Sequence, residues 1–211
     1  MNLSEWRREY TKGGLHRSDL SEDPFLQFDL WLRQAHESGI DDVNALSLAT
    51  SSAQGEPTIR TVLLKYVDQD GFVFFTNYES VKARQIAENP RVALLFPWLP
   101  LERQVIVNGS AERISALRSA RYFLSRPRGA QLGAWVSQQS GILDSRKLLE
   151  MKFEEVKQRF AKGEVPLPSF WGGFLVRPRR FEFWQGRENR LHDRFEYRRQ
   201  DASWIIQRLA P

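Results

Sequence analysis

The feature of the sequence that most restricts its fold is a pair of short polar links between apolar segments. The links Gln54–Pro57 and Asp68–Gly71 each join runs that are rich in β-branched and aromatic residues. Parallel neighbours need a crossover of a dozen or more residues, so links this short predict antiparallel strands. The runs that they separate are Ala45–Thr50, Thr58–Tyr66 and Phe72–Thr76.

Later parts of the chain contain further runs of β-branched and aromatic residues, with predicted helices between them. We expect further strands over Arg91–Pro97, Arg103–Ile114, Trp171–Trp184 and Phe195–Leu209, with Gly109 as the candidate for a bulge. Capping and breaking residues predict a helix that starts at Asp23-Pro24 and ends near Gly39. Other helices are expected over Ser80–Glu88, Ser115–Ser125 and Asp144–Ala161.

These elements predict a mainly β fold with peripheral α-helices (α+β), built as an antiparallel β-barrel or curled sheet. The chain has no Gly-x-Gly-x-x-Gly after a strand and no Walker motif, which argues against doubly wound and P-loop folds. No internal repeat or Gly/Ser linker divides the sequence, so residues 1–211 are predicted to form one domain.

Composition narrows the classes of function. The net charge is +5, but 31 basic residues are interspersed with 26 acidic ones and no nucleic-acid-binding motif accompanies them, so we expect no nucleic-acid partner. No apolar run is long enough for a membrane span and the N-terminus has no apolar leader core, so the expected location is the cytoplasm. With no cysteine and 3 histidines, a metal site is not expected, and redox chemistry would need an organic cofactor.

The segment from Phe181 to Phe195 concentrates cationic side chains within an aromatic frame. If residues 190–195 are extended, Arg190, His192 and Arg194 share one face, because side chains of a strand alternate. Two guanidiniums and an imidazole on one face suit a planar anionic ligand. A solvated edge strand with Arg/Glu pairs explains the same residues.

Four other clusters carry candidate chemistry, each with a plain structural alternative. The strand from Arg60 to Lys65 has a cation at each end, although residues of opposite parity meet one ligand only through a bend. The segment Phe75–Arg84 leads into a helix N-terminus, where Lys82 and free N–H groups favour a phosphate, or where Ser80 simply caps the helix. The remaining clusters are Tyr122 with Arg126, four apart on one helix, and the amides and hydroxyl of Gln104, Gln139 and Ser140.

The order of these motifs closely resembles the pyridoxine (pyridoxamine) 5′-phosphate oxidase family. The resemblance extends over essentially the whole chain and is carried by eight spaced motifs together with the terminal Arg208–Pro211. The motifs are Arg7–Leu15, Arg60–Lys65, Leu94–Trp98, Leu101–Gln104, Tyr122–Arg128, Gly133–Ser137, Pro166–Gly173, and Phe183–Gly186 with Arg190–Phe195.

The resemblance implies an FMN-dependent oxidase with an antiparallel split β-barrel, acting as a homodimer with FMN at the subunit interface. Such enzymes oxidise pyridoxine or pyridoxamine 5′-phosphate with O2 to pyridoxal 5′-phosphate, in biosynthesis and salvage of that vitamer. Carried over by position, the FMN-binding residues would be Arg60, Thr61, Val62, Leu63, Leu64, Lys65, Phe75, Thr76, Lys82, Gln104, Gln139, Ser140, Trp184 and Arg194. The substrate-binding residues would be Arg7, Arg8, Glu9, Tyr10, Lys65, Tyr122, Arg126, Arg190, Leu191 and His192, with residues 1–20 as a mobile segment over the site.

Arg190 and His192 are the candidate catalytic residues, because side chains on a shared face could both hold the pyridine ring of the substrate against the flavin. Asp42 is a further candidate for a carboxylate in the active site. The sequence departs from the family pattern at Val81, where an arginine is usual, and at Ala130, where a serine is usual. Weaker FMN retention is therefore expected unless Arg84 compensates. The rival functions are a different split-barrel flavin oxidase or reductase, and a non-catalytic binder of flavin or pyridoxal phosphate.

Overall fold

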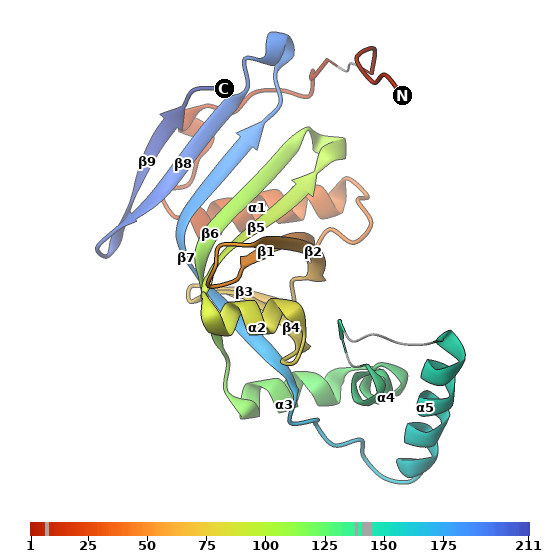
Figure 1. The fold of residues 1–211 in the computed structure, drawn as a ribbon. Helices are drawn as coiled ribbons and strands as arrows, with labels where there is room; N and C mark the ends of the chain where they lie inside the picture. The colour runs from red at the N-terminus through yellow and green to blue at the C-terminus, as the bar shows by residue number, and fades with distance from the viewer. Residues whose placement is uncertain (7–8, 138, 141–144) are drawn as a thin grey trace.

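The computed structural model describes residues 1–6, 9–137, 139–140 and 145–211. Nine strands form one antiparallel, curled sheet with helices around it (Figure 1). The strands are β1 (Ala45–Ser51), β2 (Pro57–Leu63), β3 (Tyr66–Asp68), β4 (Gly71–Asn77), β5 (Arg91–Trp98), β6 (Arg103–Arg113), β7 (Trp171–Gln185), β8 (Asp193–Gln200) and β9 (Ser203–Leu209). The helices are α1 (Pro24–Glu37), α2 (Val81–Glu88), α3 (Ala116–Ser125), α4 (Arg128–Val136) and α5 (Arg146–Arg159), with 3-10 turns η1 (Arg17–Asp19), η2 (Leu99–Leu101) and η3 (Glu188–Arg190).

The sheet curls because one predicted strand is broken. The run expected over Thr58–Tyr66 stops at Leu63, and the chain resumes as β3. The first part pairs with β1 and the second with β4, which are near opposite edges of the strand order β2-β1-β5-β6-β7-β4-β3. The break is held by the backbone N–H of Lys65, which donates to Val73 O at 2.8 Å, and by the buried side chain of Leu64. A single bent segment thus joins the two edges of the sheet.

The long strand β7 is where the sheet branches. One side of β7 pairs with β6, across the bulge at Asn108/Gly109 that the sequence predicted. On its other side, residues 171–176 pair with β4, and residues 180–185 pair with β8. The hairpin of β8 and β9 therefore extends from the barrel on one half of β7 only, which produces the split architecture (Figure 1). At Gly109 a Cβ would lie 2.3 Å from Arg177 O, so the bulge requires glycine.

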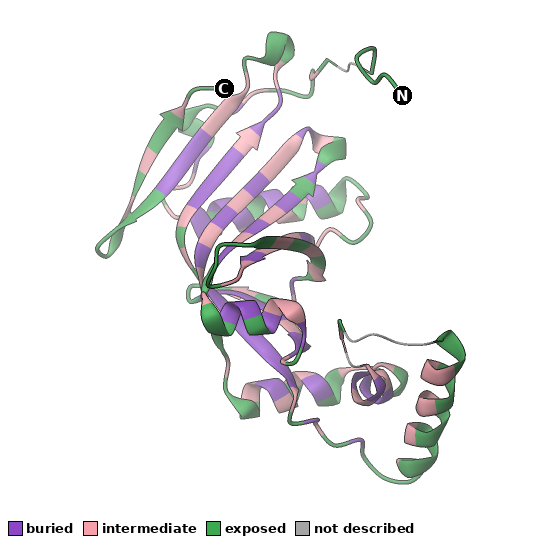
Figure 2. Cartoon of the chain, in the orientation of Figure 1, coloured by how far each residue is buried: buried purple, intermediate pink, exposed green. Residues whose placement is uncertain are grey.

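The main core lies between α1 and the concave face of the sheet (Figure 2). Asp23 caps α1 by accepting from Phe25 N, and Pro24 occupies the first turn, as predicted. Phe25, Phe28 and Trp31 follow at helical spacing and are buried against Phe72, Phe96, Phe181 and Phe183. Phe28 is fully buried, and its truncation to alanine should cost about 3–5 kcal/mol.

A second, smaller apolar cluster joins α3 and α4 to the start of β7. Its buried members include Phe123, Leu132 and Trp171. The helix α4 was not predicted, because a proline so soon after Ser125 suggests the end of a helix rather than the start of another. Pro127 is the N-cap residue of α4, a position where its missing N–H costs nothing. This cluster fixes the helices at the lower end of the molecule in Figure 1.

The other expected elements agree closely with the structure, apart from one missed turn. The predicted run Phe195–Leu209 is a hairpin in which Asp201, at φ 52°, turns the chain between β8 and β9. Among the helices that the structure describes, none is long and apolar enough to cross a membrane.

Candidate active site

Most of the predicted site residues lie in two separate clefts. The first, named here the β4–α3 cleft, has a volume of about 340 Å³. It is lined by Thr61, Val62, Leu63, Lys65, Phe75, Thr76, Lys82, Tyr122, Arg126, Gln139 and Trp171. Three of these side chains are cationic and none is a carboxylate, so the described lining favours an anion.

Lys82 is the cation in this cleft whose surroundings are best defined. It lies in the first turn of α2, and its Nζ donates to Thr76 Oγ1 at 3.2 Å and Gln139 Oε1 at 3.2 Å. Burial, and then the nearby charge of Arg60, lower the pKa of Lys82 to about 8. All its hydrogen-bond acceptors are neutral. An anion bound there would supply the counter-charge that the described surroundings lack.

The N-terminus of α2 adds backbone donors beside Lys82. Ser80 is the N-cap residue, but its side chain makes no capping hydrogen bond, so the capping alternative is wrong in this detail. Instead Val81 N donates weakly to Ser140 Oγ, at 3.4 Å. Arg84 is exposed and donates to Glu79 O, and it does not line the cleft. The structure therefore gives no contact by which Arg84 replaces the arginine usual at position 81.

Arg126 and the aromatic rings occupy the far side of the same cleft. Tyr122 stacks on Phe75 with ring centroids 3.9 Å apart, and Trp171 stacks on Phe75 at 5.4 Å. The Arg126 guanidinium lies 4.8 Å from the Trp171 ring centroid. Its buried Nη1 has no hydrogen-bond partner among the described residues, and burial lowers its pKa. A buried unpaired guanidinium nitrogen is costly, and an anionic ligand would satisfy it.

The strand from Arg60 to Lys65 meets this cleft in part. Thr61, Val62, Leu63 and Lys65 line it, because the break after Leu63 turns Lys65 toward Phe75 and Thr76. This bend does not bring both cations of the strand into the cleft. Arg60 and Leu64 do not line the cleft: the Arg60 guanidinium is held by Leu48 O, Thr50 and Thr58, and Leu64 is in the core.

The second cleft, named here the β7–η3 cleft, has a volume of about 510 Å³. Its lining residues are Trp6, Glu9, Tyr10, Trp184, Arg187, Asn189, Arg190 and His192. Tyr10 meets Trp184 and His192 edge-on, with ring centroids 5.7 and 5.5 Å apart. Tyr10, part of the N-terminal segment that the resemblance predicts over the site, thus contacts the aromatic wall of this cleft.

His192 has a defined orientation in this cleft. Its Nδ1 accepts a hydrogen bond from Arg187 N at 3.1 Å, so the neutral ring carries its proton on Nε2. Partial burial, and then the charge of Arg190, lower the pKa of His192. The ring is therefore predominantly neutral at pH 7, with Nε2–H available as a donor.

The premise that residues 190–195 are extended is wrong. Asn189 and Arg190 have φ values of 54° and 61°, in the left-handed region, and the strand starts only at Asp193. Arg190 and His192 do line one cleft, but a tight turn brings them together rather than strand alternation. Leu191 is 68% exposed and faces a neighbouring cleft with Asp193.

Three predicted flavin contacts form one row across the sheet. Gln104 on β6 pairs with Trp184 on β7, which pairs with Arg194 on β8. Paired residues on neighbouring antiparallel strands point to the same side, here the side opposite Phe183 and the core. Arg194 is an ion-pair partner of Glu182 and donates to Ala210 O.

The two clefts lie at opposite ends of β7. Trp171 starts the strand and lines the first cleft, whereas Trp184 lies next to its end and lines the second. Strand residues advance ~3.3 Å each, which puts the clefts roughly 40 Å apart along the chain. Figure 1 shows β7 running from the helical end of the molecule toward the end with both termini.

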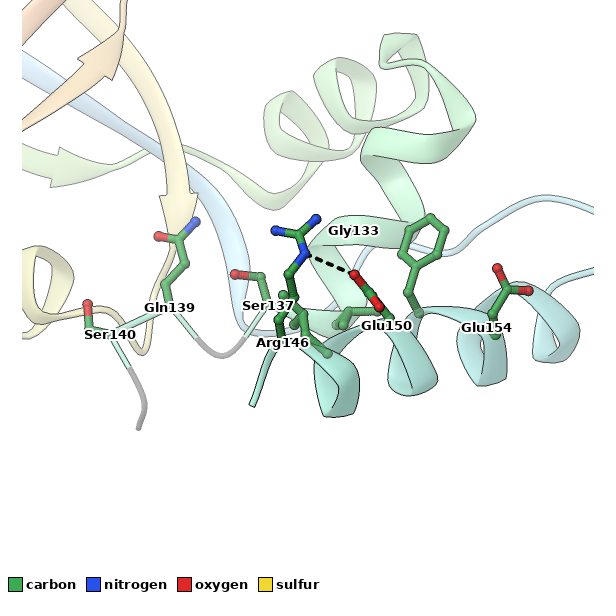
Figure 3. A pocket seen from close by; sticks show the side chains of 10 residues that line it. Gly133, Ser137, Gln139, Ser140, Arg146, Glu150 and Glu154 are labelled. Atoms are coloured by element: carbon green, nitrogen blue, oxygen red, sulfur yellow. Dashed lines mark hydrogen bonds and ion pairs between the residues drawn. The ribbon is translucent and has the colours of Figure 1, made fainter. Parts of the chain in front are cut away.

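A third cleft borders the first. It lies between α4 and α5, has a volume of about 590 Å³, and includes Gln139 and Ser140 in its wall (Figure 3). Val136, Leu149 and Phe153 supply apolar lining, and Arg146 pairs with Glu150 at 2.9 Å within helix α5. Of the described residues, it shares only Gln139 with the lining of the β4–α3 cleft.

Some predicted residues fall elsewhere, and some lining residues were not predicted. Arg7 and Arg8 lie outside the described residues, and Asp42, in a left-handed turn at φ 47°, lines neither cleft. Trp171 lines the first cleft but was not predicted to, although the motif Pro166–Gly173 contains it. Trp6, Arg187 and Asn189 were also missed, and the last has no sequence signal other than its place in the turn. Within the described part, no group of three His, Cys, Asp or Glu residues is arranged to hold a metal ion.

Comparison with known proteins gives consistent matches over the whole chain. The family profile described as "Pyridoxamine 5′-phosphate oxidase" matches residues 32–160. A profile described as "Pyridoxine 5′-phosphate oxidase C-terminal dimerisation region" matches residues 171–211. Proteins named pyridoxine/pyridoxamine 5′-phosphate oxidase are 64% identical in Crocosphaera subtropica and 55% identical in Aliarcobacter butzleri, with 100% of both chains covered in each case.

Solved structures agree in fold. PhzG from Burkholderia lata 383, solved with tetrahydrophenazine-1-carboxylic acid, has a TM-score of 0.87 at 25% identity, covering 93% of this chain and 98% of that one. An FMN-binding protein from Nostoc punctiforme, described as related to pyridoxamine 5′-phosphate oxidase, has a TM-score of 0.73 at 19% identity, covering 91% and 100%. The second likeness concerns the fold alone.

Proposed function

The chain belongs to the pyridoxamine 5′-phosphate oxidase family, and we propose that its two clefts, contributed by two copies of the chain, together form the active site. The protein is an oxidase that uses FMN and O2 to convert pyridoxine or pyridoxamine 5′-phosphate to pyridoxal 5′-phosphate. Hydrogen peroxide is released, with ammonia from the amine. The observation that carries the proposal is that residues expected to form one site line two clefts at opposite ends of β7.

The division supports a homodimer with the cofactor between subunits. Lys82 and Thr76 lie in one cleft and Trp184 in the other, yet all are expected to contact one FMN. A separation of roughly 40 Å along β7 is far longer than a flavin mononucleotide. Trp184, Arg190 and His192 also fall within residues 171–211, which match the family's dimerisation region. Two-fold pairing would place the β4–α3 cleft of one chain against the β7–η3 cleft of its partner.

The residues present fit FMN. Lys82, Thr76 and the N-terminus of α2 would hold its phosphate, since all supply donors at one end of the β4–α3 cleft. Thr61, Val62 and Leu63 would face the ring system, with Trp184 and Arg194 supplied by the partner. When bound, FMN accepts the hydride from the substrate carbon and passes the electrons to O2.

Substrate recognition would use the remaining donors. The unpaired Nη1 of Arg126, with Tyr122 and Lys65, would bind the substrate phosphate. Arg190 and His192 would come from the other cleft and orient the pyridine ring, with neutral His192 donating from Nε2. Tyr10, packed against Trp184 and His192, would exclude water above the ring.

Subunit complementation tests the shared site. Arg126→Gln damages the first cleft and Arg190→Met the second, and each variant alone should lose most of its kcat/KM with FMN still bound. When the two variants are co-expressed and pair at random, about half of the dimers are mixed, and one of the two sites in each mixed dimer is native. About a quarter of all sites are then native, so activity should recover to about a quarter of the native value. If the mixture stays as inactive as the single variants, each site belongs to one chain and the proposal fails.

Substrate choice is tested by peroxide release. Pyridoxamine 5′-phosphate should be oxidised at far lower concentrations than unphosphorylated pyridoxamine. The unphosphorylated compound offers no anion for Arg126, Tyr122 and Lys65 to bind. Equal KM values for the two would favour another flavin oxidase. FMN binding without O2 consumption with either phosphorylated vitamer would favour a non-catalytic binder.

A further inference from the structure

The outer face of β7 and β8 carries a charge cluster built around two buried glutamates, and of its members the proposed site uses Arg194 alone. Glu182 and Glu196 are paired directly across the two strands and are 4% and 3% exposed. Like charges in this position repel each other, so they persist only with compensation. Arg180 contacts both carboxylates, Arg198 pairs with Glu196 at 2.9 Å, and Arg194 pairs with Glu182 at 2.8 Å.

Arg194 is fixed from two sides within this cluster. Its Nε donates to Glu182 Oε1 at 2.8 Å, and Nη2 lies 2.8 Å from the same oxygen. On the other edge, Nη1 donates to Ala210 O at 2.8 Å. A planar guanidinium that is held at both edges can neither rotate nor swing, although its side chain is 29% exposed.

Arg194 retains binding capacity despite these contacts. A guanidinium has five N–H donors, and the contacts with Glu182 and Ala210 leave donors on Nη1 and Nη2 unused. The three arginines and two glutamates also leave one positive charge in the cluster. The side chain shares its face with Trp184 and Gln104, the other residues expected to contact FMN.

We propose that Glu182, with the C-terminal Ala210 carbonyl, is a positioning residue that holds the Arg194 guanidinium in its flavin-binding orientation. Glu182 itself would not touch the cofactor, because it is buried between Arg180 and Arg194. The inference rests on the proposed contact between Arg194 and FMN. It also identifies the groups that fix the orientation of the Arg194 guanidinium before FMN binds.

The test is a double-mutant cycle in FMN affinity, measured as fluorescence recovery when the holoenzyme is diluted. Glu182→Gln keeps the shape but removes the charge, and it should raise the FMN Kd about tenfold. Arg194→Gln should raise it at least as much. Adding Glu182→Gln to Arg194→Gln should cause no further loss, since Glu182 acts through Arg194.

Glu112→Gln is the matched control. Glu112 also pairs with an arginine, Arg177, at 2.8 Å, but it is exposed and lies at the far end of β6. Its Kd for FMN should not change. The melting temperature of each apoprotein is measured in parallel to detect a purely structural effect.

The outcomes distinguish two claims, that Arg194 contacts FMN and that Glu182 positions Arg194. If Arg194→Gln binds FMN as the native chain does, the proposed flavin contact is wrong. If Arg194→Gln weakens binding but Glu182→Gln does not, or if the two losses add, the positioning role is refuted. Should Glu182→Gln fail to fold, deletion of Ala210 and Pro211 removes the other hold on Arg194 at an exposed chain end. That deletion should also raise the FMN Kd, and again without effect in Arg194→Gln.

Discussion

The affinity for FMN should fall as the pH rises above 8, because of Lys82. In the free protein burial and Arg60 lower the pKa of Lys82 to about 8, from an ordinary value of 10.5. A phosphate dianion beside Nζ would restore the pKa at least to that ordinary value, since an opposite charge stabilises the protonated form. FMN binding would then take up one proton between these two pH values.

The size of the effect follows from the fraction of Lys82 that is protonated before binding. Nearly all of it is protonated at pH 7 and roughly a tenth at pH 9, so the FMN Kd should rise about tenfold, equal to about 1.4 kcal/mol. The phosphate itself contributes little, because its second pKa is about 6. The measurement is fluorescence quenching of FMN by the apoprotein at pH 7, 8 and 9.

Lys82→Arg should remove the pH dependence while keeping a charge in place, since a guanidinium stays protonated throughout this range. Lys147→Arg, on exposed α5, is the control and should leave the native pH profile intact. A native Kd that is constant from pH 7 to 9 would refute the argument, as would an unchanged slope in Lys82→Arg.

The same pKa shift predicts the opposite trend for the stability of the apoprotein. Between pH 8 and 10.5 the unfolded chain holds the Lys82 proton and the native chain does not. The free energy of unfolding should therefore gain a contribution that rises with pH through this window. Urea titrations at pH 8 and 9.5 should show this contribution in the native chain but not in Lys82→Arg.

Three further predictions concern other parts of the site. Val81→Arg should lower the FMN Kd about tenfold or more by adding a charge-assisted bond of about 1.5–3 kcal/mol, and an unchanged Kd in the quenching titration would show that the position does not face the phosphate. Gly186→Ala should raise the substrate KM at constant FMN Kd, because the new Cβ would lie 2.8 Å from the Tyr10 ring; Gly129→Ala, which meets open space, should not. Trp171→Ala should lower the free energy of unfolding in urea by about 3–5 kcal/mol, and a loss below 1 kcal/mol would mean that its ring is not part of the packed cluster.

Local patterns in the sequence determined most of the secondary structure. Asp23-Pro24 starts α1, Ser115 caps α3, and Gly109 produces the bulge, because capping and steric demands act over a few residues. The polar links correctly predicted antiparallel neighbours. The candidate residues came from side-chain chemistry, which depends on residue type alone, and for the most part from the order of motifs that resembles the family.

Tertiary structure decided how these residues are grouped. The break at Leu64-Lys65 depends on pairing with strands that are distant along the chain, so no pattern within Thr58–Tyr66 could show it. The left-handed turn at Asn189-Arg190 replaced the predicted alternation, because the turn between β7 and β8 must reverse the chain there.

The separation of the candidate residues into two clefts is the clearest example of what the tertiary structure decided. The sequence supplied Lys82 and Trp184 as members of one set, and only the length and pairing of β7 placed them at opposite ends of one subunit. Distances of this kind arise from the packing of many residues around Phe28 and Phe181, which no short stretch of sequence contains. The sequence therefore determined which chemical groups are present, whereas the fold decided that they line two separate clefts of one chain.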